Sequence, residues 1–221
     1  MNNLIKNKSL NLIELFASIQ GESSFVGLPT SFIRCSECNL RCRWCDSRYS
    51  HGKGSDYSLE EIIEKVKEHN CQHVCITGGE PLLQENIYPL IVTLCDLGYT
   101  VSIETNGSLC VEKIDRRAHI IMDVKCPSSG MEKKNYWRNL SVLGENDEVK
   151  FVLADRNDYV YARDVCRKFK LEENVKSILL SPAHSMLDPQ KLSSWIIEHS
   201  LRVRLNLQIH KYIWTANKRG V

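Results

Sequence analysis

The sequence predicts a single α/β domain, built either as layers or as a barrel. Strand-like and helix-like segments alternate along most of the chain, which is the pattern of βαβ units. Several strand-like segments are short apolar runs, as in parallel strands that are buried on both faces. The chain has 221 residues, and this length suits one domain, or at most two small ones, with roughly 70% of its unfolded surface buried.

Eight segments have the character of strands, and five segments between them have the character of helices. The clearest helix begins at Ser58, where Ser-Leu-Glu-Glu predicts a capping box with Glu61 as its second partner. Another helix stops at Gly98, a residue type that commonly follows a helix end. The strands are expected over 12–19, 30–34, 73–77, 100–104, 119–124, 148–153, 177–181 and 202–208, and the helices over 58–68, 84–97, 131–143, 158–169 and 188–199.

The loops that follow the strands are expected to carry the chemistry. Parallel strands joined by helices place these loops at one end of the sheet, where α/β folds assemble their sites. The loops are rich in Gly, Pro, Cys and small polar residues, and they span 35–50, 78–81, 105–107, 125–130 and 181–184.

The composition excludes several classes of protein. The chain is 43% hydrophobic and 25% charged, as in ordinary globular proteins. Its net charge of +2 predicts no basic face for nucleic acid. The first twenty residues do not resemble a signal peptide, and no apolar run is long enough to span a membrane, so a cytoplasmic location without membrane partners is expected.

Ten cysteines in a reducing compartment indicate metal or redox chemistry rather than disulfides. Cys38, Cys42 and Cys45 form a C-x3-C-x2-C run, in which three thiolates of one loop can bind a four-iron cluster and leave one iron open. Adding Cys35 would give four ligands for structural zinc, but three residues between two C-x2-C halves leave little room for a second knuckle. The spacing therefore favours a cluster, with Cys35 as a spectator. The remaining six are expected to be small buried hydrophobes: Cys71, Cys75, Cys95, Cys110, Cys126 and Cys166.

The cysteine run, with Trp44 before its last cysteine and Gly78-Gly79-Glu80-Pro81 about thirty residues later, resembles the radical S-adenosylmethionine enzymes. In that family three cysteines bind a 4Fe-4S cluster, S-adenosylmethionine chelates the open iron, and the glycine-rich strand end contacts the cofactor. A glycine pair suits this role because a chain without Cβ atoms can approach a ligand closely. Glu104 resembles a further contact, to the ribose hydroxyls of the cofactor.

Motifs along nearly the whole chain resemble more narrowly the 7-carboxy-7-deazaguanine synthase family. They include Gln20-Gly21-Glu22 before the cysteines and Asp46-Ser47 after them. Further matches are 123–130, 147–151, 180–182, 207–214 and 219–221. The resemblance implies an incomplete (βα)6 TIM-like barrel of parallel strands in one domain over 1–221, with a cluster loop at 35–50 and a C-terminal segment at 207–221 that closes over substrate.

The resemblance also implies a lyase of the queuosine and deazapurine pathway. Its substrate would be 6-carboxy-5,6,7,8-tetrahydropterin, whose ring contracts with loss of ammonia to 7-carboxy-7-deazaguanine. The 4Fe-4S cluster and a recycled S-adenosylmethionine would carry the radical chemistry, without a catalytic side chain. The resemblance further implies Mg²⁺ as a cofactor, a homodimeric assembly, and flavodoxin or ferredoxin as the electron donor.

Site residues follow from the same resemblance. Gln20 offers a paired donor and acceptor for a flat heterocycle, and Arg34 offers a planar fork for a carboxylate. Ser47 stands where the family usually has Thr as a magnesium ligand. The cluster would be held by Cys38, Cys42 and Cys45; the cofactor by Trp44, Cys45, Asp46, Gly79, Glu104, Asp123, Lys125 and Ser181; and the substrate by Ile19, Gln20, Gly21, Arg34, Thr77, Lys211 and Val221.

Two departures and two alternatives accompany this interpretation. Ser23 and Glu37 stand where family members usually have Gly, so each is expected to affect a tight turn that favours φ > 0. One alternative is an activating enzyme that places a radical on a protein partner, for which Gln20 and Arg34 would have no evident purpose. The other is a zinc or cluster module that binds RNA, which would need a basic aromatic patch.

Overall fold

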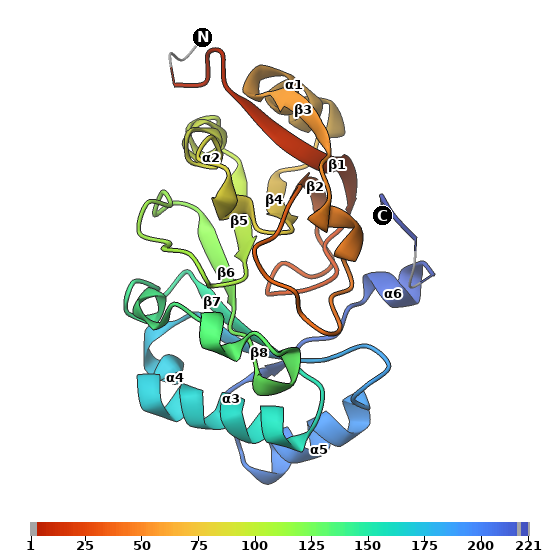
Figure 1. Cartoon of the computed structure of the whole chain (residues 1–221), viewed down its shortest axis with the longest axis vertical. Helices are drawn as coiled ribbons and strands as arrows, with labels where there is room; N and C mark the ends of the chain where they lie inside the picture. The colour runs from red at the N-terminus through yellow and green to blue at the C-terminus, as the bar shows by residue number, and fades with distance from the viewer. Residues whose placement is uncertain (1–3, 216–217, 221) are drawn as a thin grey trace.

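The computed structural model describes residues 4–215 and 218–220 as one mostly parallel sheet with helices against it (Figure 1). The strand order is β3-β1-β2-β4-β5-β6-β7-β8-β9, so the sheet is open between β3 and β9. The strands are β1 Ser9–Ile19, β2 Pro29–Cys35, β3 Ser55–Ser58, β4 His73–Gly78, β5 Thr100–Thr105, β6 His119–Asp123, β7 Glu148–Leu153, β8 Ser177–Pro182 and β9 Arg204–Leu205.

The helices lie mainly between the parallel strands, as βαβ units require. The α-helices are α1 Leu59–His69, α2 Ile87–Asp96, α3 Arg156–Phe169, α4 Leu171–Asn174, α5 Pro189–Glu198 and α6 His210–Ile213. Short 3₁₀ turns are η1 Arg48–His51, η2 Pro81–Leu83, η3 Pro127–Ser129, η4 Glu132–Lys134 and η5 Trp137–Ser141. None of the helices within the described ranges has the length and apolar character needed to cross a membrane.

The sheet confirms the incomplete barrel. Strands β2, β4, β5, β6, β7 and β8 pair in parallel and in sequence order, and the two-residue β9 continues the series. The first strand does not join this parallel set, because β1 pairs antiparallel with both β2 and β3. The short loop 20–28 returns the chain directly from β1 to β2, and such a loop permits only antiparallel pairing.

Most predicted elements are confirmed to within a few residues. The capping box of α1 is present, since Ser58 Oγ accepts from the Glu61 backbone N–H and Glu61 Oε2 accepts from the Ser58 backbone N–H. Gly98 follows α2 with φ +86°. The strand expected over 202–208 shrinks to β9, and β3, α4 and α6 were not predicted.

The helix predicted over 131–143 is wrong, because this segment forms only the 3₁₀ turns η4 and η5. Two asparagines direct it instead. The side chain of Asn135 pairs with both backbone groups of Lys125, and that of Asn139 bonds to the backbone of the 107–111 loop. These side-chain bonds hold the segment against two other loops of the chain, in a conformation other than a continuous helix.

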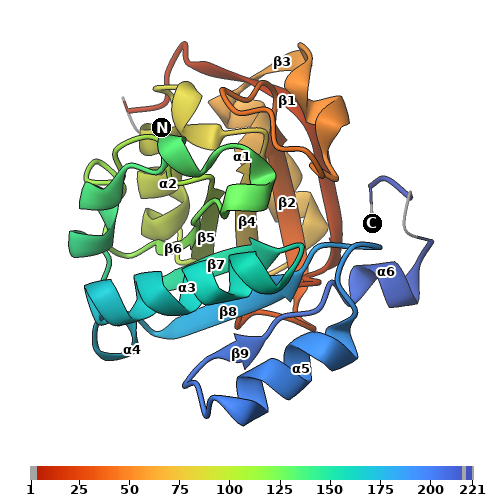
Figure 2. The ribbon, with the colours of Figure 1, turned by 60° about the horizontal axis from the view of Figure 1, so that its bottom comes forward.

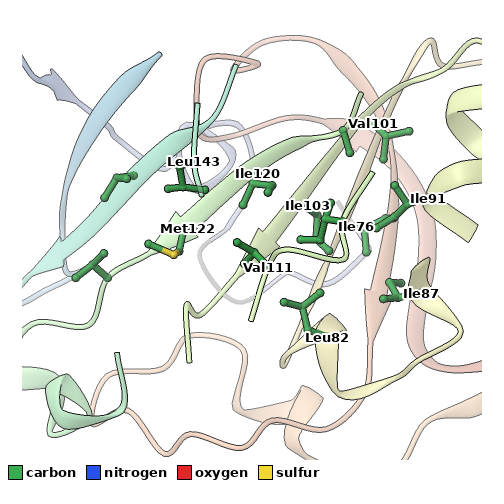
Figure 3. Close-up of a cluster of buried hydrophobic side chains, with 14 of the residues drawn as sticks. Ile76, Leu82, Ile87, Ile91, Val101, Ile103, Val111, Ile120, Met122 and Leu143 are labelled. Carbon is green, nitrogen blue, oxygen red and sulfur yellow. The ribbon is translucent and has the colours of Figure 1, made fainter. Parts of the chain in front are cut away.

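The core lies between the sheet and the helices outside it. Figure 3 shows Ile76 and Ile103 of neighbouring strands on the side of Ile87 and Ile91 of α2, and Ile120 of β6 nearer to Met122 and Leu143 in the same cluster. Ile76, Ile87, Ile91 and Ile103 are fully buried. Each such side chain stabilises the fold by about 1.5–3 kcal/mol through burial, so the parallel strands form a rigid support for the loops that follow them.

Candidate active site

A cavity of about 520 Å³ opens at the carboxyl ends of the parallel strands. This is the end at which the sequence placed the chemistry, because parallel strands bring their following loops together there. Every candidate site residue that the structure describes lines this cavity; Val221 lies outside the described residues. The lining includes Ile19, Gln20, Gly21, Arg34, Cys38, Cys42, Trp44, Cys45, Asp46, Ser47, Thr77, Gly79, Glu104, Asp123, Lys125, Ser181 and Lys211.

The three cysteines of the run are partly exposed and line the cavity. The Leu40 backbone N–H lies 3.4 Å from Cys38 Sγ, a contact that stabilises a thiolate. Cys45 Sγ lies 3.5 Å from His51 Nε2 and 3.7 Å from the hydroxyl of Ser47. In the described ranges no three His, Cys, Asp or Glu side chains are grouped closely enough for a single metal ion. Three thiols spread around one cavity instead fit a larger four-iron cluster.

Cys35 lies apart from this set. Its side chain is fully buried in the hydrophobic core and does not line the cavity. Burial, with a further contribution from the Glu80 carboxylate, raises the pKa of the Cys35 thiol to about 12. Cluster and zinc ligands are thiolates, so a thiol held protonated in the core fits the spectator role.

The glycine pair after β4 allows two loops to touch. A Cβ on Gly78, which has φ +130°, would lie 2.2 Å from the Cys35 carbonyl oxygen. A Cβ on Gly79 would lie 1.8 Å from the Glu37 carbonyl oxygen and 3.0 Å from Cys38 Cβ. The absence of side chains at Gly78 and Gly79 therefore lets their backbone contact the 35–50 loop of the same chain. This contact holds Cys38 beside the cavity.

Glu80 ties the same loops together, a role that sequence reasoning missed. Its buried carboxylate accepts from the Leu82 backbone N–H at 3.0 Å, from Thr105 Oγ1 at 2.9 Å and from the Asn106 backbone N–H at 2.7 Å. Burial raises the pKa of Glu80, although these three bonds oppose the rise. The only signal in the sequence was a carboxylate directly after a glycine pair.

One wall of the cavity carries an ion pair with an unsatisfied oxygen. Lys125 Nζ lies 2.9 Å from Asp123 Oδ2, while Asp123 Oδ1 is buried without a hydrogen-bond partner among the described residues. Burial would lower the pKa of Lys125, but the Asp123 carboxylate raises it overall, so the ammonium stays charged. Because buried polar atoms are rarely left unpaired, the free oxygen suits a donor on a bound ligand.

The Gln20 amide offers a complementary donor. Its Oε1 accepts from the Glu22 backbone N–H at 3.2 Å, and its Nε2 is buried without a partner in the described part of the chain. Beside the same cavity, Arg34 Nε donates to Glu14 Oε2 at 2.9 Å, which orients the guanidinium. Thr77 Oγ1 donates to Glu104 Oε2 at 2.9 Å, so Glu104 is linked to a candidate substrate residue.

A buried ion pair below these residues was also missed. Lys150 Nζ lies 2.8 Å from Glu22 Oε2, and both side chains are about 12% exposed. Burial would raise the pKa of Glu22, but the Lys150 ammonium lowers it overall. The same pair faces Glu104, whose pKa is raised by burial despite the attraction of Lys150. The sequence gives no local signal for a pair whose members lie 128 residues apart.

The C-terminal segment follows β9 and carries α6 (Figure 2). Its residues Gln208, His210 and Lys211 line one side of the cavity. Gln208 Nε2 donates to Asp46 Oδ2 at 3.0 Å, and Lys211 Nζ lies 3.5 Å from the same oxygen. A Cβ on Gly21 would lie 2.1 Å from His210 Nδ1, so only glycine permits this packing. The segment therefore contacts both the cluster loop and the Gln20–Glu22 loop.

The two residues that replace glycines of the family pattern both have the positive φ that glycine favours. Ser23 has φ +67° and Glu37 has φ +64°. The left-handed conformation costs a non-glycine residue about 1 kcal/mol or more. The turns expected at these two positions are therefore present and strained rather than reshaped.

Comparison with known proteins defines the class first. Residues 33–124, which hold the cysteine run and the glycine pair, match the Radical SAM superfamily. The crystal structure of QueE from Escherichia coli superposes with a TM-score of 0.74 over 90% of this chain and 94% of that one, at 22% identity, and shares the fold. The fold and the site thus define a radical S-adenosylmethionine enzyme, which uses a 4Fe-4S cluster and S-adenosylmethionine.

Relatives over the full length specify the family. The 7-carboxy-7-deazaguanine synthase of Koribacter versatilis is 42% identical, covering 96% of this chain and all of the relative. That of Chlorobaculum tepidum is 40% identical over 96% of this chain and 97% of the relative. The chain belongs to the 7-carboxy-7-deazaguanine synthase family.

Proposed function

We propose that the protein converts 6-carboxy-5,6,7,8-tetrahydropterin to 7-carboxy-7-deazaguanine with release of ammonia. The observation that carries this proposal is a single cavity that combines the three cysteines with the Gln20 amide and the Arg34 guanidinium. The 7-carboxy-7-deazaguanine synthase of Koribacter versatilis, which is 42% identical over its whole length, supports it. A cavity of about 520 Å³ suits a small heterocycle beside a nucleoside cofactor. These features favour a small-molecule substrate over a protein partner.

The residues around the cysteines fit the cluster and its cofactor. Cys38, Cys42 and Cys45 would hold three irons, and the surrounding wall would hold S-adenosylmethionine. When bound, these groups supply the radical that starts the ring contraction. The unsatisfied Asp123 Oδ1 would accept a hydrogen bond from the cofactor, while Lys125 Nζ, 2.9 Å from Oδ2, holds the carboxylate in place. The other proposed cofactor contacts are Trp44, Asp46, Gly79, Glu104 and Ser181.

The substrate would be oriented by side chains that the protein already holds at one atom, which leaves their other polar atoms for the substrate. Gln20 Oε1 is held by a backbone N–H, so its free Nε2 donates to an acceptor on the pterin ring. The Arg34 guanidinium, held at Nε by Glu14, turns its outer nitrogens to the carboxylate. Ile19, Gly21, Thr77 and Lys211 complete the proposed pocket, and Val221 is proposed with them from the family pattern alone.

Magnesium is proposed at Ser47, whose hydroxyl lines the cavity two residues after Cys45. One hydroxyl binds magnesium weakly, so carboxylate oxygens of the substrate and water would supply the other ligands.

The assembly and its cellular setting are also proposals. We place the protein in the cytoplasm, supported by ten cysteines that are all free thiols. We propose a homodimer, supported by exposed apolar side chains near the open edge of the sheet, and a flavodoxin or ferredoxin as electron donor. The whole chain, 1–221, would act as one functional unit, with no role for nucleic acid or membrane.

The test is an anaerobic assay of cluster-reconstituted, reduced protein with S-adenosylmethionine, Mg²⁺ and 6-carboxytetrahydropterin, read by mass spectrometry. The expected result is 7-carboxy-7-deazaguanine with little net loss of S-adenosylmethionine. Formation of 5′-deoxyadenosine without product would retain the class of enzyme and reject the substrate. Omission of Mg²⁺ in a parallel reaction tests the magnesium proposal.

A further inference from the structure

Asn206 is a buried polar residue to which the family pattern assigns no role. It directly follows β9 in the chain and is 5% exposed. The segment after it leads to α6 (Figure 2). Its backbone N–H donates to the Leu180 carbonyl oxygen at 2.9 Å and so continues the pairing with β8. A buried amide side chain in this position must find partners for both of its ends.

Those partners come from two distant parts of the cavity wall. Asn206 Oδ1 accepts from the Ser23 backbone N–H at 2.8 Å. Asn206 Nδ2 lies 2.8 Å from Ser181 Oγ. The orientation of the amide is fixed by chemistry, since a backbone N–H can only donate and must therefore face the amide oxygen. Nδ2 consequently donates to Ser181.

This direction determines what the Ser181 hydroxyl can offer. A serine hydroxyl has one hydrogen to donate and two lone pairs to accept with. One lone pair is occupied by Asn206, and in the described residues the hydrogen has no acceptor. Ser181 is 3% exposed and lines the cavity. Its O–H is therefore free to donate to a molecule bound there.

We infer that Asn206 is a positioning residue that sets Ser181 as a hydrogen-bond donor to S-adenosylmethionine. The inference rests on the proposed place of Ser181 in the cofactor wall. The same amide holds Ser23 and so fixes the end of the Gln20–Glu22 loop, which carries the proposed substrate contacts. One side chain thus aligns the cofactor wall with the substrate loop.

Asn206→Asp tests the direction of this bond with almost no change of shape. The carboxylate still accepts from the Ser23 N–H, but its second oxygen can only accept, so the Ser181 hydrogen turns toward it and away from the cavity. We expect the affinity of the cluster-loaded protein for S-adenosylmethionine to fall about three- to tenfold, as for one lost hydrogen bond. The measurement is equilibrium dialysis without reductant or pterin.

The matched control is the same substitution in a Ser181→Ala background. Ser181→Ala alone should lower the affinity by a similar factor, and Asn206→Asp should then have no further effect, because no hydroxyl remains to be turned. A further loss in that background would show that the new charge, not the hydroxyl, weakens binding, and would overturn the inference. Unchanged affinity in either single variant would overturn it as well.

Asn206→Ala separates the two contacts of the amide. It removes the partner of Ser23 as well, so it should weaken pterin binding, which Asn206→Asp should spare. Equal effects of both variants on pterin binding would reject the role of Asn206 in the substrate loop. Iron content and thermal unfolding of each variant establish that it is folded and loaded. Failure of the proposed function is recognised separately, since it would appear as absence of product in the unsubstituted protein, whose cofactor affinity is measured independently.

Discussion

At the scale of single residues, burial divides the four cysteines between 35 and 45 into two kinds. The expectation that the six scattered cysteines are all buried is wrong for Cys110, which is exposed, and for Cys95, which is partly exposed. Cys38, Cys42 and Cys45 are partly exposed at the cavity, whereas Cys35 is fully buried three residues before Cys38. Cluster ligands must be thiolates that reach the iron, and a thiol whose pKa lies near 12 in the core meets neither condition. Position in the fold therefore supports Cys38, Cys42 and Cys45, and not Cys35, as the proposed ligands.

Cys35→Ala is therefore expected to keep the cluster. The variant should reconstitute with the same iron and sulfide content as the original protein. Its stability should fall by about 1–2 kcal/mol, because a small buried side chain is removed. Cys38→Ala is the matched control and should lose the cluster. A Cys35→Ala protein without iron would contradict the spectator role.

Glu37 provides a test of backbone strain next to the cluster loop. At φ +64° a glycine relieves the conflict between Cβ and the backbone, so Glu37→Gly should stabilise the protein by about 0.5–1 kcal/mol. This corresponds to a rise in Tm of about 1–4 °C for a chain of this length.

Glu37→Ala separates this effect from the loss of charge. Alanine retains the Cβ, so its Tm should stay near that of the original protein. Equal stabilisation by alanine and glycine would show that the charge of Glu37, not its φ, is unfavourable.

At the scale of elements, the loop 20–28 closes the amino-terminal end of the barrel. The Ser24 backbone N–H donates to the carboxylate of Glu148 at the start of β7. Phe25 packs with Ile121 and Leu179, and its ring stacks on His73 with centroids 4.4 Å apart. The same loop carries Gln20 to Glu22 into the cavity, so packing at the base of the barrel supports the substrate side of the site.

His73 makes the stability of this end of the barrel depend on pH. Its ring bonds to Thr30 and Ser102 at 2.8 and 2.9 Å in a buried position. Burial, and then the neighbouring His119, lower the pKa of His73 from 6.5 to about 4. Between these two pH values the unfolded chain binds a proton that the folded chain does not, so stability falls as the pH falls through this range. At about pH 5 the loss is about 2 kcal/mol.

Urea unfolding at about pH 7 and about pH 5 tests this prediction. His73→Gln, which keeps a polar group at the position of Nε2 and does not titrate, should remove about 2 kcal/mol of the difference between the two pH values. The other histidines also make stability depend on pH, and this contribution is the same in both proteins. An identical difference in the variant would mean that His73 does not titrate in this way.

At the scale of the whole molecule, the open sheet leaves apolar surface near β9. Ile197 of α5 is 77% exposed, Tyr212 and Ile213 of α6 are 74% and 52% exposed, and Leu205 of β9 is 36% exposed. Exposed apolar side chains beside an open sheet edge are typical of surfaces that pair with another chain. A homodimer that uses this edge would cover them.

Light scattering during size-exclusion chromatography should therefore give about twice the 25.4 kDa mass of one chain. Ile197→Asp should shift the equilibrium toward the single chain, because the charge would be buried in the dimer, while the exposed position leaves the fold unaffected. Lys65→Asp, on the exposed face of α1, serves as the matched control. A single-chain mass at all concentrations would reject the homodimer.

The sequence by itself determined the features that depend on local pattern. Strand and helix periodicity predicted the parallel α/β architecture, Ser58 and Glu61 specified a helix start, and the C-x3-C-x2-C run brought three thiols to one cavity. These signals lie within a few residues of one another, and the interactions behind them are equally local. The sites of Gln20 and Arg34 followed from family resemblance, and both line the cavity.

Only the tertiary structure decided the features that depend on distant partners. Lys150 meets Glu22 across 128 residues, and Asn206 meets Ser23 across 183. The helix expected over 131–143 is replaced by turns because Asn135 and the buried Asn139 bond to the backbone of other loops. Such contacts form only when the fold removes water from polar groups and makes them find partners, and no local pattern encodes which partner that is.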